Sequence, residues 1–178
     1  MSLADRMSEY VAACFTGLWV QSCEHEDALA ELAQMCRKEQ WNLAIWDIDG
    51  GLQVPGQGNG QSLDAGGNDP LAAIRAINAL ASPESSALLV LVNFHRFINS
   101  PEVIQAMAKQ IVNGKANRTF LVILSPLVQI PTELEKQFIV VEHELPTREQ
   151  LESIFSVHPA EAYVAGRTRQ ETNGAAAT

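Results

Sequence analysis

The sequence predicts an α/β protein in which a five-stranded, mainly parallel sheet lies between two layers of helices, a three-layer sandwich. Short apolar runs alternate along the chain with segments whose apolar residues recur at helical spacing. Two of these runs, residues 87–92 and 119–124, are apolar without alternation, as is typical of strands covered on both faces. The 178 residues, 47% of them hydrophobic, suffice for one domain with a core of its own.

The first half of the chain predicts two strands and two helices. Residues 15–22 (FTGLWVQS) combine aromatic and branched side chains, which favours a strand. A helix is expected at about residues 24–39, because acidic residues stand where the helix dipole favours negative charge. Residues 41–48 (WNLAIWDI) predict the second strand. The second helix is expected to begin after Asp69, an N-cap followed by proline, and to end at about residue 81.

The segment of residues 50–68 is rich in glycine and holds almost no large apolar side chain. Because such a composition buries too little surface to fix its own conformation, we expect a flexible loop there. The tail at residues 160–178 is small, polar and without periodicity, and it is expected to be disordered. The predicted domain therefore spans residues 1–159.

The second half of the chain predicts three strands. Residues 87–92 (ALLVLV) and 119–124 (TFLVIL) are expected in the interior of the sheet. The second of these runs stops at Ser125-Pro126, because proline cannot donate to a strand ladder. Residues 138–141 predict the fifth strand.

Helices are expected between and after these strands. One begins at Pro101 and is predicted to end at the Asn113-Gly114 pair, a common helix stop. A short helical turn is expected near residues 132–136. Thr147 and Gln150 have the spacing of a capping box and predict the start of a last helix.

Charge and hydropathy exclude several classes of function. With 21 acidic residues against 12 basic ones the formal net charge is −9, so the surface repels phosphate backbones and nucleic acid is not expected as a partner. No apolar run approaches the roughly 18 residues that a membrane span needs, and the first ten residues carry charges instead of a secretory-signal pattern. We therefore expect a cytoplasmic protein without a membrane partner.

The three cysteines, Cys14, Cys23 and Cys36, lack C-x-x-C spacing. Buried free thiols are the simplest interpretation, because unpaired cysteine packs as a small apolar side chain. A zinc site made of Cys23, His25 and Cys36 is the alternative, but it lacks a fourth ligand at a recognisable spacing. The sequence predicts no metal site and no cofactor.

The turn after the first strand lacks the features of a phosphate-binding loop. Such a loop needs glycines that open the backbone to phosphates, followed by Lys and Ser or Thr. Here the strand leads into residues 22–27 (SCEHED), whose three carboxylates repel a triphosphate. The Gly114-Lys115 pair follows a helix, which is the wrong context. Asn93, after the third strand, brings no charge for holding magnesium.

Polar residues at the predicted strand ends are the candidates for a ligand crevice. Asp47 shares its side of the second strand with Asp49. The two are either a metal-binding or catalytic pair, or one of them caps the following glycine turn, and the frequency of Asp in turns favours capping. The crevice candidates are Ser22, Asp47, Asn93 and Ser125.

No nucleophile and base can be paired from the sequence. Ser22 and Ser125 lack the G-x-S-x-G context of a hydrolase, and the histidines His25, His95 and His143 are scattered. His95 near a strand end is either an acid–base group or a structural histidine, and the structural role is the commoner one. No catalytic residue is predicted.

Six segments, in order within about residues 16–155, resemble one family. They are residues 17–21 (GLWVQ) with the acidic helix start at 24–27, 46–52 (WDIDGGL), 93–98 (NFHRFI), 123–126 (ILSP), 130–136 (IPTELEK) and 145–151 (LPTREQL). These segments are similar to the α/β region that precedes the ATPase module in AAA ATPases encoded in red-algal plastid genomes and in cyanobacteria and other bacteria. Asn93 departs from the pattern, which has Asp there.

The resemblance implies a fold like that of P-loop NTPases and AAA domains, without the phosphate loop. The function it implies is a non-catalytic module that mediates protein–protein assembly or regulates an associated ATPase. The implied partner is a protein: a second copy, an AAA ATPase subunit or a client protein. The expected location is the cytoplasm or, for a plastid-encoded chain, the stroma. A residual nucleotide-binding or ATPase domain that uses the strand-end crevice is the alternative. A clamp-loader-like subunit would need a basic DNA-facing patch, which the charge disfavours.

Overall fold

The sheet has six strands in the order β3-β2-β4-β5-β1-β6 in the computed structural model, which describes residues 1–55 and 67–144. All neighbouring strands pair in parallel except β2 and β3, which are antiparallel. β4 and β5 lie in the interior, as predicted. The strands are β1 (Gly17–Gln21), β2 (Asn42–Asp47), β3 (Gly51–Gln53), β4 (Ala87–Val92), β5 (Thr119–Ser125) and β6 (Ile139–Glu142).

Strand β3 corrects the predicted count of five strands and part of the predicted loop at residues 50–68. The carboxylate of Asp47 accepts the backbone N–H groups of Asp49 and Gly50 at 2.9 and 2.6 Å, which folds the chain back on itself. Leu52 then lies opposite Trp46 and is buried, so one apolar side chain suffices to hold a three-residue strand. Residues 56–66 of the predicted loop lie outside the described residues.

Four α-helices and two short 3-10 helices accompany the sheet in the described part of the chain. The helix α1 was not predicted, although its signals are present: Ser2 and Asp5 form a capping box, and Leu3 and Met7 are buried on one face. The predicted helix after Thr147 and the tail at residues 160–178 lie outside the described residues. The helices are α1 (Leu3–Ala12), α2 (His25–Glu39), α3 (Pro70–Leu80), η1 (Phe94–Arg96), α4 (Pro101–Asn117) and η2 (Thr132–Leu134).

Helix α4 continues past the stop predicted at Asn113-Gly114 and ends at Asn117, capped by Arg118 in the left-handed conformation (φ 53°). Gly114 is buried inside the helix. A Cβ atom at this position would collide with the backbone oxygen of Thr119 and press on Thr16. The glycine is therefore required for close packing of the helix on the sheet, and not for ending the helix.

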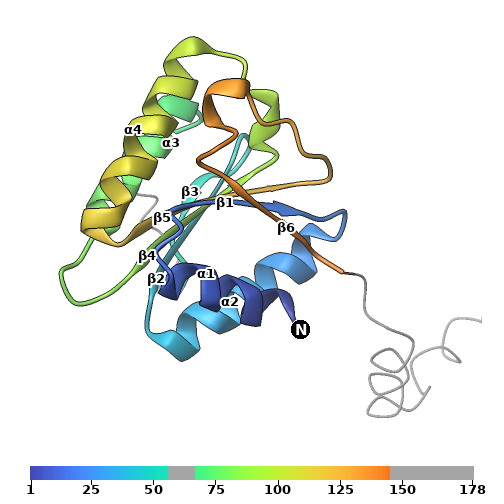
Figure 1. Ribbon diagram of the computed structural model, residues 1–178, viewed down its shortest axis with the longest axis vertical. Coiled ribbons are helices and arrows are strands. Elements are labelled where there is room, and N and C mark those ends of the chain that lie inside the picture. The colour runs from blue at the N-terminus through green and yellow to red at the C-terminus, as the bar shows by residue number, and fades with distance from the viewer. Residues whose placement is uncertain (56–66, 145–178) are drawn as a thin grey trace, which may run out of the picture. The chain divides into compact units, whose positions relative to one another are not determined.

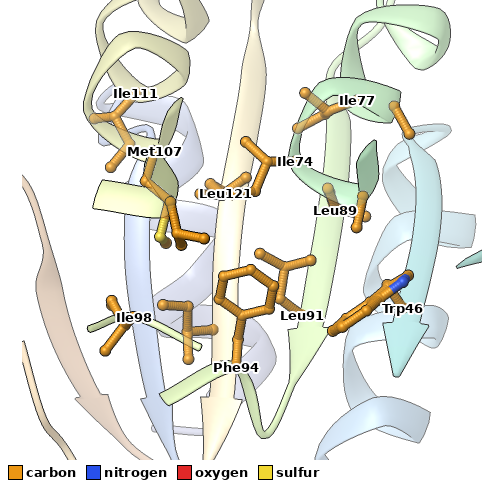
Figure 2. Packing of buried hydrophobic residues seen from close by; sticks show 14 of the residues in the cluster. Trp46, Ile74, Ile77, Leu89, Leu91, Phe94, Ile98, Met107, Ile111 and Leu121 are labelled. Carbon is orange, nitrogen blue, oxygen red and sulfur yellow. The ribbon is translucent and has the colours of Figure 1, made fainter. Parts of the chain in front are cut away.

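The helices cover both faces of the sheet, which confirms the layered α/β architecture (Figure 1). Helices α3 and α4 pack on one face, and α1 and α2 pack on the other. Each face of the sheet has its own hydrophobic core, and the side chains of the interior strands alternate between the two. Leu89 and Leu91 of β4 belong to the core with α3 and α4, as Figure 2 shows, while Leu88 and Val90 belong to the core with α1 and α2. None of the helices in residues 1–55 and 67–144 is both long and apolar enough to cross a membrane.

The chain leaves the neighbouring strands β1 and β5 toward opposite faces of the sheet. After β1 it enters α2, whose Leu32 belongs to the core on one face. After β5 it enters η2, whose Leu134 belongs to the core on the other face. In open α/β sheets the crevice for a ligand forms at such a switch point, outside the carboxyl ends of the strands. The carboxyl ends of β1 and β5 are therefore the place to look for a site.

Candidate functional site

The carboxyl ends of β1 and β5 bring Ser22 and Ser125 together, two of the four residues predicted to line a crevice. The backbone N–H of Ser22 donates to the carbonyl oxygen of Ser125 at 2.9 Å. Only Ser22, Cys23 and Glu24 separate β1 from α2. This turn is short and contains no glycine, so it offers little backbone with which to surround a phosphate.

The hydroxyl of Ser125 is fully used inside the fold. Ser125 is 0% exposed, its Oγ accepts the indole N–H of Trp19 at 2.9 Å, and the same Oγ donates to the carbonyl oxygen of Leu127 at 2.7 Å. Trp19 is also fully buried and packs edge-on against Phe138 at 5.8 Å between ring centres. Ser125 therefore holds the loop after β5 in place and satisfies a buried indole.

Replacing Ser125 with alanine is expected to lower the free energy of unfolding by about 1–3 kcal/mol, because the buried Trp19 N–H loses its acceptor. Chemical unfolding measured by tryptophan fluorescence tests this. Ser8→Ala on α1 is the matched control, since Ser8 is only partly buried and the change should stay within about 0.5 kcal/mol. Equal stability of the two variants would contradict a structural role for Ser125.

Ser22 belongs to a chain of hydrogen bonds that the sequence did not reveal. Its Oγ accepts the backbone N–H of Glu24 at 3.0 Å and lies 2.8 Å from Nδ1 of His143. Nε2 of His143 lies 3.4 Å from Oε1 of Glu31, whose other oxygen accepts the backbone N–H of Ala4 at 3.3 Å. With the neutral ring assigned its proton on Nε2, the Ser22 hydroxyl donates to Nδ1 and the ring donates to Glu31.

The order Ser22, His143, Glu31 has the composition of a nucleophile, a base and an orienting carboxylate. The burial of its members favours a structural role, because Ser22 is 4% exposed and the His143 side chain 7% exposed. A nucleophile must reach its substrate, whereas this hydroxyl is enclosed and bonded twice. We call this chain of hydrogen bonds through Ser22, His143 and Glu31 the relay. It connects the start of α1, the middle of α2 and the end of β6 to the carboxyl end of β1.

The other two crevice candidates lie at the same edge of the sheet and do not join this relay. Asp47 caps the turn between β2 and β3, which is the favoured interpretation of the sequence. Asn93 follows β4 in the left-handed conformation (φ 54°), and its backbone N–H donates to the carbonyl oxygen of Leu124 at 2.8 Å. The side chain of Asn93 is exposed. All four candidates thus lie along one edge of the sheet. The Ser22 and Ser125 hydroxyls and the Asp47 carboxylate are already hydrogen-bonded to other groups of the fold.

An aromatic cluster fills the space beside the ends of β2 and β4. The ring of Phe94 lies 5.4 Å from that of Trp46 and 5.6 Å from that of Phe97, measured between centres. Phe94 and Trp46 are both fully buried and point toward each other in Figure 2. Edge-on aromatic contacts of this kind add about 0.5–1.5 kcal/mol each beyond the area that they bury.

His95 is buried without a hydrogen-bond partner. It is 4% exposed, and neither of its ring nitrogens has a partner in the part of the chain that the structure describes. Burial lowers the pKa of His95, and the nearby charges of Arg96 and His25 lower it further. Nε2 of His25, the first residue of α2, is also buried without a described partner. Two histidines with unsatisfied nitrogens therefore stand at the same edge as the crevice candidates.

Protonation of His95 is expected to destabilise the fold at low pH. The pKa in the folded state lies below the ordinary value of 6.5, so between these two values the unfolded chain binds more protons. The stabilisation is present above pH 6.5 and is lost as the pH falls through the folded pKa. Unfolding free energies at pH 8 and pH 5 should differ less in His95→Gln than in the original chain. The same pH dependence in both chains would contradict this assignment.

The three cysteines lie in different environments. Within residues 1–55 and 67–144, no three His, Cys, Asp or Glu side chains gather closely enough to hold a metal ion. Cys36 lies on the buried face of α2, and burial raises the pKa of its thiol to about 12. Cys14 is half-buried and Cys23 is exposed, so the prediction of buried thiols is wrong for these two. Cys23 lies in the turn between β1 and α2, where its neighbours in the sequence are not apolar and do not cover its thiol.

Comparison with known proteins identifies the family of this chain. The model of the family described as "SpoVK-like AAA ATPase, N-terminal domain" matches residues 3–143. The match spans nearly all of the compact unit Met1–Glu144. No curated protein matches the chain. The resemblance to the region that precedes the ATPase module of AAA ATPases is thereby confirmed at the level of the family, and the chain belongs to the SpoVK-like AAA ATPase N-terminal domain family.

Proposed function

We propose that this domain is a non-catalytic AAA-like module that mediates protein–protein assembly or regulates an associated AAA ATPase. One observation carries the proposal: the Ser22 and Ser125 hydroxyls, at the switch point where an α/β sheet would hold a ligand, are enclosed in hydrogen bonds of the fold itself. A ligand would have to break these bonds before making its own. The membership of the family supports a role associated with AAA ATPases.

The electrostatics of the β1–α2 turn support the same proposal. A bound triphosphate needs backbone N–H groups and a lysine after the first strand. Here the N–H of Glu24 is already donated to Ser22, and the first turn of α2 carries Glu26 and Asp27. Three carboxylates close to the helix N-terminus offset the attraction that its dipole offers to an anion.

The second candidate function is a residual nucleotide-binding domain, and one observation favours it. His25 and His95 hold buried ring nitrogens without described partners at the carboxyl edge of the sheet, and Asn93 is exposed there. Such groups can accept or donate hydrogen bonds to a ligand. These groups do not supply the positive charge that phosphates require. Burial lowers the pKa of His95 and keeps its ring neutral near pH 7.

Calorimetric titration of the full chain with ATP and magnesium separates the two functions. The proposal predicts no binding heat at millimolar nucleotide. Asn93→Asp introduces an acid at this position and is the matched variant. It should also show no binding, because the turn after β1 still offers no cradle for phosphates. Saturable binding by the original chain that is lost in Asn93→Ala would support the residual nucleotide-binding domain instead.

We further propose that the partner is a protein, either a second copy or an AAA ATPase, met in the cytoplasm or, for a plastid-encoded chain, in the stroma. The net charge of −9 supports a protein partner over nucleic acid. Addition of the domain to an AAA ATPase from the same source should change its assembly or its rate of ATP turnover. An unchanged rate together with no complex in gel filtration would count against a regulatory role for that ATPase.

A further inference from the structure

Two helix-lined grooves lie on opposite layers of the fold. One, of about 300 Å³, runs between α1 and α2. The other, of about 430 Å³, runs between α3 and α4. The sheet separates the two helix layers, as Figure 1 shows, so no single copy can bring its two grooves together.

The two grooves carry opposite charge. The groove between α1 and α2 is lined by the carboxylates of Asp5, Glu31 and Glu39 against a single base, Lys38. The groove between α3 and α4 is lined by Arg75 and Lys109 against a single carboxylate, Glu102. We name them the acidic groove and the basic groove.

The helices as a whole follow the same division. Helices α1 and α2 together hold six carboxylates against three bases, whereas α3 and α4 hold three bases against one carboxylate. The layer formed by α3 and α4 is therefore basic, although the chain as a whole has a net charge of −9. The helices on the two faces of the sheet therefore carry net charges of opposite sign.

The charges in the grooves are not paired with each other. Within the described residues the only contact of a base with a carboxylate within 4.0 Å joins His143 and Glu31. Glu102 of the basic groove accepts the Ser100 hydroxyl at 2.6 Å and stays exposed, and the exposed Arg75 and Lys109 outnumber it. Unpaired charges at exposed positions are available to a partner surface without breaking contacts of the fold.

Each groove also has an apolar floor. Met35, 5% exposed, lies in the acidic groove, and Ile74, 1% exposed, lies in the basic groove. On α4, Val112 is 61% exposed and lies one helical turn beyond Lys109, beside the basic groove. An exposed valine next to charged side chains gives this face an apolar anchor within a polar rim, the arrangement found in protein interfaces.

We propose that the acidic groove of one copy of this chain docks on the basic groove of a second copy. This inference rests on the proposed assembly function and names its surfaces. A second copy carries both matching charge patterns on its own helices, so each groove finds a complementary surface on it. Because the two surfaces differ, the contact is head-to-tail, and it generates a ring if the rotation between copies closes and an open stack if it does not.

The net charge of −9 opposes self-association, and ionic strength decides how strongly. At 0.15 M salt the Debye length is about 8 Å, so repulsion between distant charges is screened more than the pairs in direct contact. Exposed ion pairs contribute about 0.2–1 kcal/mol each. The interface is therefore weak and is favoured by high local concentration.

Sedimentation velocity of the full chain from about 1 to 500 μM, in 0.15 M salt, tests the proposal. The original chain should form oligomers as its concentration rises. A basic-groove variant, Arg75→Glu with Lys109→Glu, and an acidic-groove variant, Gln34→Lys with Glu39→Lys, should each weaken association at least about tenfold. All four positions are exposed on helices, so the fold is retained, which circular dichroism checks. Lys115→Glu, on α4 outside the groove, is the matched control and should associate normally.

A mixture of the two variants supplies the decisive result. The basic-groove variant keeps its acidic groove and the acidic-groove variant keeps its basic groove. The mixture should therefore associate more strongly than either variant alone. An original chain that stays monomeric throughout, oligomers that survive both variants, or a mixture that stays monomeric would each overturn the proposal. Nucleotide binding is measured separately by calorimetry, so failure of the docking surfaces is distinguishable from failure of the non-catalytic function.

Discussion

Phe94→Ala is expected to lower the free energy of unfolding by about 3–5 kcal/mol. Phe94 is 0% exposed and stands at the centre of an aromatic cluster, in contact with the rings of Trp46 and Phe97. Its removal leaves a cavity at the point where β4 leads into η1. Asn93, in the left-handed conformation, and the short helix η1 hold the backbone there, so the surrounding residues cannot close the cavity. The loss therefore combines transfer free energy with an unfilled volume.

Urea unfolding followed by tryptophan fluorescence measures this loss directly, since Trp46 lies in the cluster. Ile48→Ala is the control, because Ile48 is 47% exposed at the tip of the β2–β3 turn and should change stability by less than about 0.5 kcal/mol. A loss under 1 kcal/mol in Phe94→Ala would mean that the carboxyl edge beside β4 can repack, and that it is less rigid than the buried cluster indicates.

Gly17→Val is expected to destabilise the fold by about 3 kcal/mol or more, at the upper end of overpacking costs. Gly17 begins β1 and is buried. A Cβ atom there would collide with the backbone oxygen of Gln137 and touch the end of Ile111. The backbone oxygen cannot rotate away, so either β1 or the segment that leads into β6 must shift, and β1 pairs with both β5 and β6.

Thermal unfolding of Gly17→Val against Gly50→Val tests the cause of this effect. A Cβ atom on Gly50 would meet chiefly the far end of the Gln53 side chain, which can move at little cost. Gly50→Val should therefore retain most of the stability, while Gly17→Val should lose cooperativity or unfold at a much lower temperature. Similar melting of the two variants would show that the approach of Gln137 to β1 is not a constraint.

Local sequence signals were sufficient for most of the fold. The unbroken apolar runs predicted β4 and β5 as interior strands, because only burial on both faces tolerates such runs. Helix α3 begins at Pro70 after the Asp69 cap, as predicted from that pair alone. Helix α1 could have been predicted from the Ser2–Asp5 capping box and the buried face of Leu3, Met7 and Val11.

Other features have no local signal. Strand β3 is three residues long and depends on the turn that Asp47 closes, so its glycine-rich sequence resembles a loop. Gly114 has the sequence signature of a helix stop, yet close packing against Thr119 decides its role. In both cases tertiary contacts outweigh local preference.

The candidate site was predicted only in part. The sequence predicts Ser22 and Ser125 at one edge, because parallel strands end at the same side of the sheet. The hydrogen bond from Ser22 to His143, which is 121 residues away, has no signal in the sequence, and neither has the contact of Glu31 on α2 with His143. Such partners follow from the position of β6 beside β1 and the docking of α2 beneath it, and neither is encoded in residue spacing.

ATP hydrolysis by the purified full chain, measured as phosphate release in the presence of magnesium, tests directly whether this domain is non-catalytic. Phosphoryl transfer relies on a glycine-rich loop and a lysine after the first strand and on an acid that holds magnesium. The three residues between β1 and α2 include no glycine and no lysine, and position 93 after β4 is Asn. We predict no phosphate release above that of buffer at millimolar ATP. Turnover that is abolished by Ser22→Ala or Asn93→Ala would contradict the account, because it would assign the chemistry to the edge where the fold uses its own polar groups.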